Sequence, residues 1–202
     1  MQQQTQQMQQ QLQQQTQRQN NMIVFGLGNP GAEYEGTRHN VGFKTIEKVA
    51  AQKLLKLRKR CFRLYKRADG ENFTLIEPLT YMNNSGEIFP ELVKDGEEVV
   101  VVVDQMDLPP GKVRIKRGGG SAGHNGLKSI IANYGENFIR IYIGIGRPEE
   151  GVSVPDYVLS RPSAEDSALI EASTDRARDA IISLIEGEEF AKLVQSVNSF
   201  KA

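Results

Sequence analysis

His39 and Asp104 have the side chains and the surroundings that suit proton transfer in this chain. His39 is one of two histidines among 202 residues, and histidine titrates near neutral pH. Asp104 comes directly after the apolar run 98–103, which predicts a central strand buried on both faces. Open α/β sheets place their sites at the carboxyl ends of such strands. A histidine held by an aspartate, without a serine or cysteine nucleophile beside a base, indicates a general base acting on water.

Three asparagines supplement this pair on predicted loops: Asn29, Asn83 and Asn125. Neutral amides can polarise a carbonyl and stabilise an oxyanion without adding charge. Each asparagine also has a purely structural explanation, because asparagine favours turns and helix caps. The chemistry of this group therefore depends on whether the fold brings it to one place.

The elements that would position these residues alternate between strands and helices. Strands are predicted at 22–25, 73–77, 98–103, 113–116 and 139–145, and helices at 42–57, 86–93, 124–134, 163–184 and from about 188 to 198. An asparagine or serine is expected to cap the helix at 86–93. This alternation predicts a single-domain α/β fold, with a twisted, mixed and largely parallel sheet and helices on both sides.

An alternative function is suggested by Gly26, Gly28 and Gly31, which match the G-x-G-x-x-G fingerprint of dinucleotide-binding proteins. That fingerprint requires a helix opening at the third glycine and a second strand ending in an acidic residue. Glutamates and a glycine follow Gly31 instead, and the next periodic segment predicts a helix. A nucleotide-binding enzyme is therefore the weaker alternative.

Two further segments have open interpretations. Residues 53–67 contain eight Lys or Arg residues and no acid, which fits either a solvated helix end with a charged edge strand or a phosphate-contacting patch. The glycine-rich segment Gly118–Gly123 lacks the Gly-Lys-Ser/Thr ending of a P-loop, so a lid is favoured over a phosphate cradle. Asp107 precedes Leu-Pro-Pro-Gly and is expected to serve the turn and not to bind a metal.

The composition limits the remaining possibilities. Lys plus Arg and Asp plus Glu each number 25, so nucleic-acid binding must come from local patches and not from a basic coat. The single Cys61 excludes an internal disulfide, no metal site is expected, and no apolar run is long enough to span a membrane. Residues 1–21 are mostly glutamine and are expected to be a disordered tail outside the domain at 22–202.

Four motifs together resemble those of the bacterial-type peptidyl-tRNA hydrolase family: GLGNPGAEYEGTRHNVGF, PLTYMNNSG, VVVDQMDLPPGKVRIKRGGGSAGHNGLKSI and IYIGIGRP. They follow one another at fitting spacings through nearly all of residues 22–200. The resemblance implies an enzyme that cleaves the ester between a peptide and the terminal ribose of tRNA, and so recycles tRNA from stalled translation. It implies no cofactor, a monomer, a cytoplasmic location and peptidyl-tRNA as the partner.

The same resemblance assigns roles to residues. His39 would be the general base, Asp104 would orient it, and Asn29 would help distinguish a peptidyl amide from a free amino group. The residues that would bind the peptide and the tRNA end are Tyr34, Tyr81, Asn83 and Asn125, and those near the acceptor-stem phosphates are Lys112, Lys116 and Arg117.

This sequence departs from the family pattern at several places, and the departures concern tRNA affinity more than catalysis. Tyr81 stands where phenylalanine is frequent, Gln105-Met106 replaces an acid-aliphatic pair, and Tyr142 and Arg147 lie where members differ. Plastid relatives of the fold that assist splicing suggest a non-catalytic RNA-binding module as a second alternative. The presence of His39, Asp104 and all three asparagines argues against that alternative.

Overall fold

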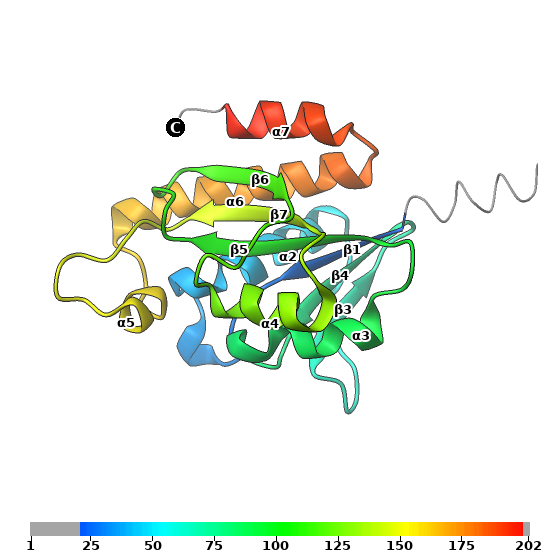
Figure 1. The fold of residues 1–202 in the computed structure, drawn as a ribbon, viewed down its shortest axis with the longest axis horizontal. Coiled ribbons are helices and arrows are strands. Elements are labelled where there is room, and N and C mark those ends of the chain that lie inside the picture. The colour runs from blue at the N-terminus through cyan, green and yellow to red at the C-terminus, as the bar shows by residue number, and fades with distance from the viewer. Residues whose placement is uncertain (1–20, 200–202) are drawn as a thin grey trace, which may run out of the picture.

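A seven-stranded mixed sheet forms the centre of the protein (Figure 1). The computed structural model describes residues 21–199; residues 1–20 and 200–202, and with them nearly all of the expected tail at 1–21, lie outside the described part. The strands are β1 (Met22–Gly26), β2 (Arg58–Lys59), β3 (Tyr65–Asp69), β4 (Phe73–Pro78), β5 (Glu98–Gln105), β6 (Val113–Arg117) and β7 (Ile139–Gly144), in the order β2-β3-β4-β1-β5-β7-β6.

Strand direction divides the sheet into a parallel centre and antiparallel edges. β4, β1, β5 and β7 run parallel, whereas β2, β3 and β6 join the two edges in antiparallel pairs. The carboxyl ends of the four central strands therefore meet at one edge of the sheet, and the loops that leave them lie side by side. The predicted mixed sheet is confirmed, with its parallel part confined to the centre.

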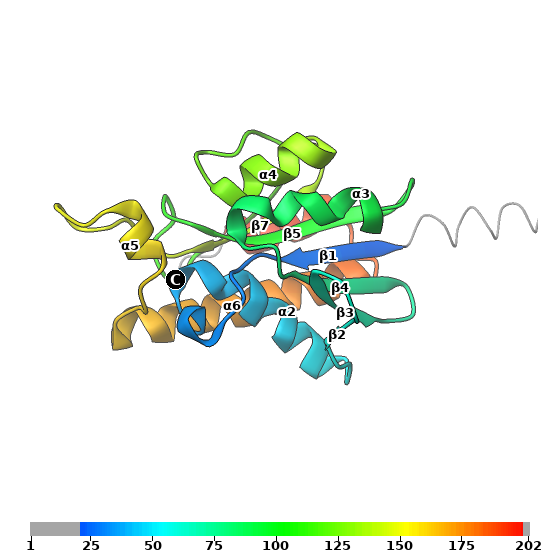
Figure 2. The ribbon, with the colours of Figure 1, turned by 90° about the horizontal axis from the view of Figure 1, so that it is seen from below.

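Helices cover both faces, as expected. Figure 2 shows α3 and α4 on one face and α2 and α6 on the other. The α-helices are α2 (Val41–Gln52), α3 (Phe89–Leu92), α4 (Asn125–Tyr134), α5 (Val154–Val158), α6 (Ala164–Ile185) and α7 (Phe190–Asn198), and the 3₁₀ helices are η1 (Ala32–Tyr34), η2 (Arg38–Asn40) and η3 (Met82–Ile88). None of the described helices is long and apolar enough to cross a lipid bilayer.

The core lies in two layers because side chains alternate along each strand. In β5, Val100 and Val102 belong to the cluster under α2 and α6, whereas Val99, Val101 and Val103 belong to the cluster under α3 and α4. All five are at most 1% exposed, so the prediction of a strand buried on both faces is confirmed.

The predicted helix at 42–57 was too long. Helix α2 ends at Gln52, and Leu54 then adopts φ 55° with its side chain in solvent. The amide of Leu55 donates to the carbonyl of Ala50 at 2.8 Å, which closes the helix end. Such ends usually carry glycine at the left-handed position, and the leucine here gave no stop signal.

The predicted helix at 86–93 is helical in the structure, but it begins earlier and lacks the expected asparagine or serine cap. The segment is the 3₁₀ helix η3 followed by the short α3, and neither has a side-chain cap of its own. The amide of Met82 donates instead to Oδ1 of Asn29, which comes from a distant loop.

Residues 53–67 follow the edge-strand interpretation in structure. β2 is the outermost strand, and its two residues are exposed basic side chains. Such charges protect a sheet edge from pairing with another chain.

Candidate active site

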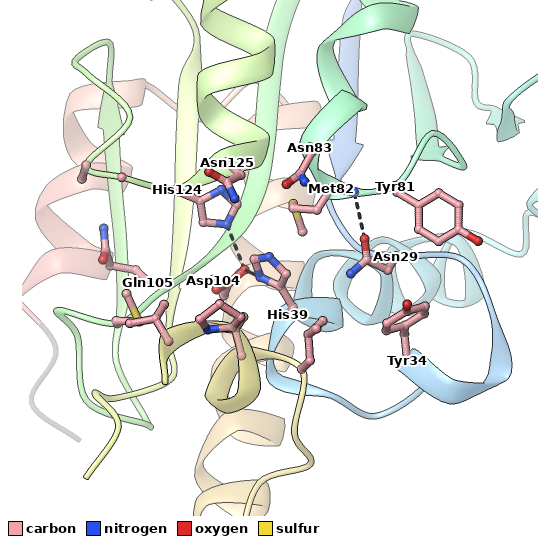
Figure 3. A pocket seen from close by; sticks show the side chains of 17 residues that line it. Asn29, Tyr34, His39, Tyr81, Met82, Asn83, Asp104, Gln105, His124 and Asn125 are labelled. Carbon is pink, nitrogen blue, oxygen red and sulfur yellow. Dashed lines mark hydrogen bonds and ion pairs between the residues drawn. The ribbon is translucent and has the colours of Figure 1, made fainter. Parts of the chain in front are cut away.

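A cleft of about 420 Å³ opens where the central strands end. Its lining contains all seven residues that were expected to act on the substrate or bind it in the cleft: Asn29, Tyr34, His39, Tyr81, Asn83, Asp104 and Asn125 (Figure 3). They come from the loops after β1 and β4, from the end of β5 and from the start of α4. The parallel order of the strands explains why residues so distant in sequence share one cleft.

Close backbone packing brings His39 to Asp104. Gly42 lies where a Cβ atom would be 2.4 Å from the Leu27 nitrogen and 2.6 Å from the Val102 carbonyl oxygen, so only glycine lets α2 begin this near to β1 and β5. His39 lies three residues earlier, on η2, and Nδ1 of its ring is 2.7 Å from Oδ1 of Asp104. The two side chains are 12% and 2% exposed.

The electrostatics of the pair favour an ionised aspartate beside a basic histidine. Burial opposes ionisation of Asp104, but the charges and hydrogen bonds of both imidazoles outweigh it and hold the pKa of Asp104 well below its usual range. Burial disfavours protonated His39, but its attraction and hydrogen bond to Asp104 outweigh that effect and raise the pKa of His39 above 6.5. An ionised carboxylate can only accept, so Nδ1 of His39 donates and Nε2 keeps its lone pair.

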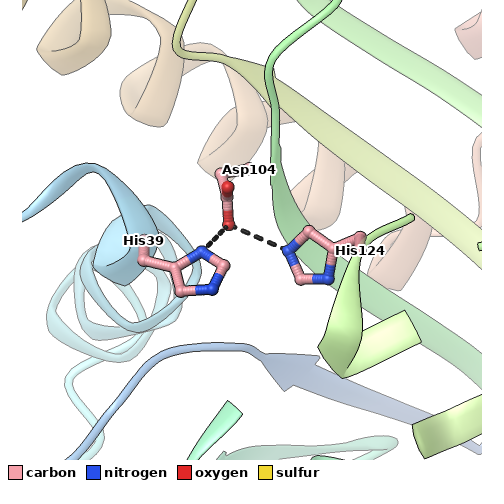
Figure 4. Close-up of side chains that lie close together, drawn as sticks. All are labelled: His39, Asp104 and His124. Atoms are coloured by element: carbon pink, nitrogen blue, oxygen red, sulfur yellow. Dashed lines mark hydrogen bonds and ion pairs between the residues drawn. The ribbon is translucent and has the colours of Figure 1, made fainter. Parts of the chain in front are cut away.

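His124 is a member of the site that the sequence analysis missed. Its Nε2 lies 3.0 Å from the same Oδ1 of Asp104 (Figure 4). Its Nδ1 accepts from the Leu127 amide at 3.3 Å. Because Nδ1 accepts from this amide, Nε2 is the nitrogen that donates to Asp104. The only signal in the sequence was that His124, the second histidine of the chain, precedes Asn125.

The same three side chains are also close enough together to be considered as metal ligands. Among the described residues, His39, Asp104 and His124 bring ligand atoms within 4.8 Å of one another. Nδ1 of His39 and Nε2 of His124 both donate to Asp104, so each of these nitrogens would have to lose its proton before it could bind a metal ion. Hydrogen bonding accounts for the arrangement without an ion.

Asn29 is fixed by three hydrogen bonds, two with Asn40 and one with Met82. Its backbone amide and carbonyl are both 2.9 Å from the side-chain amide of Asn40, and its Oδ1 accepts from Met82 at 2.8 Å. The Nδ2 group is then the part of Asn29 left for a ligand, and Figure 3 shows it on the side of the ring of His39. A side-chain amide has both a donor and an acceptor, and in Asn29 the fold already uses the acceptor.

The remaining wall of the cleft is apolar. It includes Met106 after β5 and four residues of the α5 segment: Val154, Pro155, Val158 and Leu159. Helix α5 was not predicted, although Ser153 caps it by accepting from the amide of Asp156, and a proline follows within the first turn. Serine followed by an acid three residues later is a recognisable helix-start signal.

The basic residues expected to contact phosphates lie on or beside the edge strand β6, outside the cleft lining. Lys116 and Arg117 are exposed, but both guanidinium Nη atoms of Arg117 are 2.8 Å from the carboxylate of Glu98. This ion pair offsets the charge of Arg117, whose contact with phosphates stays a prediction, as do those of Lys112 and Lys116. Asp107 forms an ion pair with Arg147 in addition to lying in the expected turn.

Known proteins resemble this chain in sequence and in fold. The family profile described as peptidyl-tRNA hydrolase matches residues 23–202. The chain belongs to the peptidyl-tRNA hydrolase family. It is 48% identical over 166 residues to the peptidyl-tRNA hydrolase of Geobacillus thermodenitrificans, covering 78% of this chain and 89% of that protein. It is 40% identical to the Bacillus subtilis protein of that name, covering 90% and 98% of the two chains.

Solved structures agree with these sequence matches. The crystal structure of peptidyl-tRNA hydrolase from Acinetobacter baumannii superimposes with a TM-score of 0.80 at 32% identity, over 91% of this chain and 97% of that one. Membership of the family makes the chain an enzyme of the hydrolase class. The nucleotide-binding alternative does not fit the structure, because the three-residue η1, and not a long helix, follows the third glycine.

Proposed function

We propose that the enzyme hydrolyses the ester bond between a peptide and the 3′-terminal ribose of tRNA, and thereby recycles tRNA from stalled translation. The observation that carries this proposal is the 2.7 Å contact between Nδ1 of His39 and Oδ1 of Asp104, which leaves Nε2 of His39 as a base in the cleft. No other described residue bonds to that Nε2, and Figure 4 shows it turned away from Asp104.

His39 would activate a water molecule in this mechanism. Nε2 takes a proton from the water while the water oxygen bonds to the ester carbonyl carbon. When the bond from that carbon to the ribose oxygen breaks, the imidazolium returns the proton to the ribose oxygen. Asp104 stabilises the imidazolium and holds the ring in the tautomer that exposes Nε2.

His124 would keep Asp104 in place for this task. It donates to the same carboxylate oxygen as His39, so it fixes that oxygen from the opposite side of the cleft. Because the Leu127 amide occupies Nδ1 of His124, the ring has no free lone pair for proton transfer. His124 therefore supports the base without competing with it.

The amides would bind the substrate around the ester. Nδ2 of Asn29 can donate to a peptide carbonyl and gains nothing from an ammonium group, which favours peptidyl over aminoacyl substrates. Asn83 and Asn125 line the same cleft and can donate to the developing oxyanion, and the rings of Tyr34 and Tyr81 also line it. The ring centroids of the two tyrosines are 6.3 Å apart.

Phosphates of the acceptor stem would lie along β6, chiefly at Lys116 and Lys112, with Arg117 contributing less. Whether residues 53–67 also contact tRNA stays an open prediction. Within the same proposal the enzyme works as a monomer in the cytoplasm, needs no cofactor, and has its catalytic domain at 22–202 after a glutamine-rich tail.

Incubation with N-acetylaminoacyl-tRNA tests the proposal. Free tRNA should appear without added metal or nucleotide, and His39→Ala should lose several orders of magnitude in turnover while still binding tRNA. Near-normal turnover in His39→Ala would remove this mechanism. Binding of tRNA without cleavage by the unaltered protein would instead favour the RNA-binding alternative.

A further inference from the structure

Arg140 is a buried cation without a carboxylate partner. The side chain is 0% exposed, and it forms no ion pair with any acidic side chain in the described part of the chain. Its guanidinium donates to the carbonyls of Gly119, of Gly120 at 2.5 Å and of Glu136 at 3.4 Å, and it lies 4.4 Å from the ring centroid of Phe138. Burial of an unpaired charge is costly, so this arrangement requires an explanation beyond general stability.

The three carbonyls flank helix α4 on both sides. Gly119 and Gly120 precede α4, and Glu136 follows its last residue by two positions. The guanidinium is planar and rigid, with donors pointing in several directions, so it can bind both segments at once. The segment Gly118–Gly123, which was expected to be a lid, is thus attached to β7 by the side chain of Arg140.

Helix α4 carries one wall of the cleft. His124 is its N-cap and Asn125 is its first residue. The helix is also packed against η3, which carries Asn83: the Gly86 amide donates to Oγ of Ser129 at 2.9 Å, and a Cβ atom on Gly86 would lie 2.2 Å from the Ser129 carbonyl oxygen. A displacement of α4 would therefore move His124 and Asn125 together with η3, which carries Asn83.

We infer that Arg140 is a positioning residue for the reaction. By donating to carbonyls on both sides of α4, it holds His124 at hydrogen-bonding distance from Asp104. The inference rests on the proposed function of His39 as the base. Arg140 itself touches neither the substrate nor the base, so its effect would pass through the 3.0 Å bond from His124 to Asp104.

A displacement of His124 should raise the pKa of His39. Asp104 of β5 forms hydrogen bonds with both His39 and His124, the N-cap of α4. Tyr34 and Tyr81 also line the cleft but form no hydrogen bond with His39. If His124 withdraws, the carboxylate loses one donor and attracts the protonated ring of His39 more strongly. The pKa of His39 then rises, and the acid limb of kcat/KM moves to higher pH.

The test uses Arg140→Met, which removes the charge and the donors but keeps the length of the side chain. Because the chain has two histidines, the pKa of His39 can be followed by NMR without any assay of activity. We expect the His39 pKa to rise by about 0.5 unit or more, and kcat to fall about tenfold or more. His124→Ala should raise the pKa similarly, and the double variant should add no further shift.

Two further variants keep the result decisive. Leu193→Ala, in the buried face of α7 far from the cleft, should lower Tm with unchanged kcat and His39 pKa, which controls for lost stability alone. If Arg140→Met does not fold, Arg140→Lys takes its place. The same rise in the His39 pKa and fall in kcat are expected, because lysine lacks the planar fork of donors that spans the two segments.

Several outcomes would overturn the inference. A folded Arg140 variant with the His39 pKa and kcat of the unaltered enzyme would do so, as would a shift that adds to that of His124→Ala. If the enzyme cleaved no ester at all, the proposed function would fail, but the NMR titration would still report whether Arg140 acts on His39.

Discussion

Replacing Asp104 by asparagine removes the charge that makes His39 basic while changing almost nothing in size. The raised pKa of His39 depends on Asp104, whereas its burial acts in the opposite direction. A hydrogen bond to a charged group is worth about 1.5–3 kcal/mol, which corresponds to about 1–2 pH units. In Asp104→Asn the pKa of His39 should therefore fall below 6.5, because burial alone remains.

Two measurable changes follow for Asp104→Asn. The acid limb of the pH profile of kcat/KM should move to lower pH, since the base loses its proton more readily. Turnover on the plateau should nevertheless fall by about 10²–10⁴-fold, because the imidazolium is no longer stabilised and the amide NH₂ can select the wrong tautomer. The assay is release of tRNA from N-acetylaminoacyl-tRNA at closely spaced pH values.

The chain supplies a matched control three residues away. Asp107 is exposed, pairs with Arg147 and does not line the cleft. Asp107→Asn should therefore leave the acid limb of the pH profile of kcat/KM and the turnover on its plateau unchanged. An Asp104→Asn enzyme with the limb and plateau of the unaltered enzyme would refute the reasoning, because Asp104 would then have no influence on His39.

Three other predictions concern discrimination between peptidyl-tRNA and aminoacyl-tRNA, binding of tRNA, and thermal stability. Asn29→Asp should narrow the ratio of kcat/KM between N-acetylaminoacyl-tRNA and aminoacyl-tRNA, because a carboxylate oxygen would face the cleft and attract an ammonium group; an unchanged ratio would place discrimination elsewhere. Lys116→Ala should reduce the slope of log affinity for tRNA against log salt concentration by about 0.7–0.9. Arg117→Ala should reduce it by less, because Glu98 already neutralises Arg117. Equal slopes for the two variants in filter-binding assays would contradict this prediction. Burial raises the pKa of Glu77 above 4.5 despite its 2.7 Å contact with Lys66, so ionisation costs stability as pH rises from 4.5 through the folded pKa. Glu77→Gln should thus raise Tm by about 2 °C or more near pH 8 and leave it unchanged near pH 4. An equal rise in Tm at both pH values would show that the titration of Glu77 is not the cause.

The sequence alone determined the class of the fold and most members of the site. Apolar periodicity located the central strands and most of the helices, because the pattern of burial is written directly into residue type. The carboxyl-end rule placed Asp104 at a site, and the motif spacing placed His39 and the asparagines with it. These inferences need only local patterns and the general rule that loops after parallel strands converge.

The tertiary structure decided which polar atoms are already used. Asn29 offers an acceptor in sequence, but Met82 occupies it, and Arg117 offers a charge that Glu98 neutralises. The end of α2 at a left-handed Leu54 also lacked any local signal. Hydrogen bonds between distant residues form only when the chain has folded, so residue type cannot show whether an atom remains free.

His124 and Arg140 show the same limit at the site itself. His124 lies 20 residues from Asp104 and Arg140 lies 20 residues from Gly120, and nothing in the intervening sequence joins them. The parallel pairing of β5 with β7 and the packing of α4 over that pair bring these residues together. The sequence thus predicted which groups could transfer a proton, and packing determined how close these groups lie to one another.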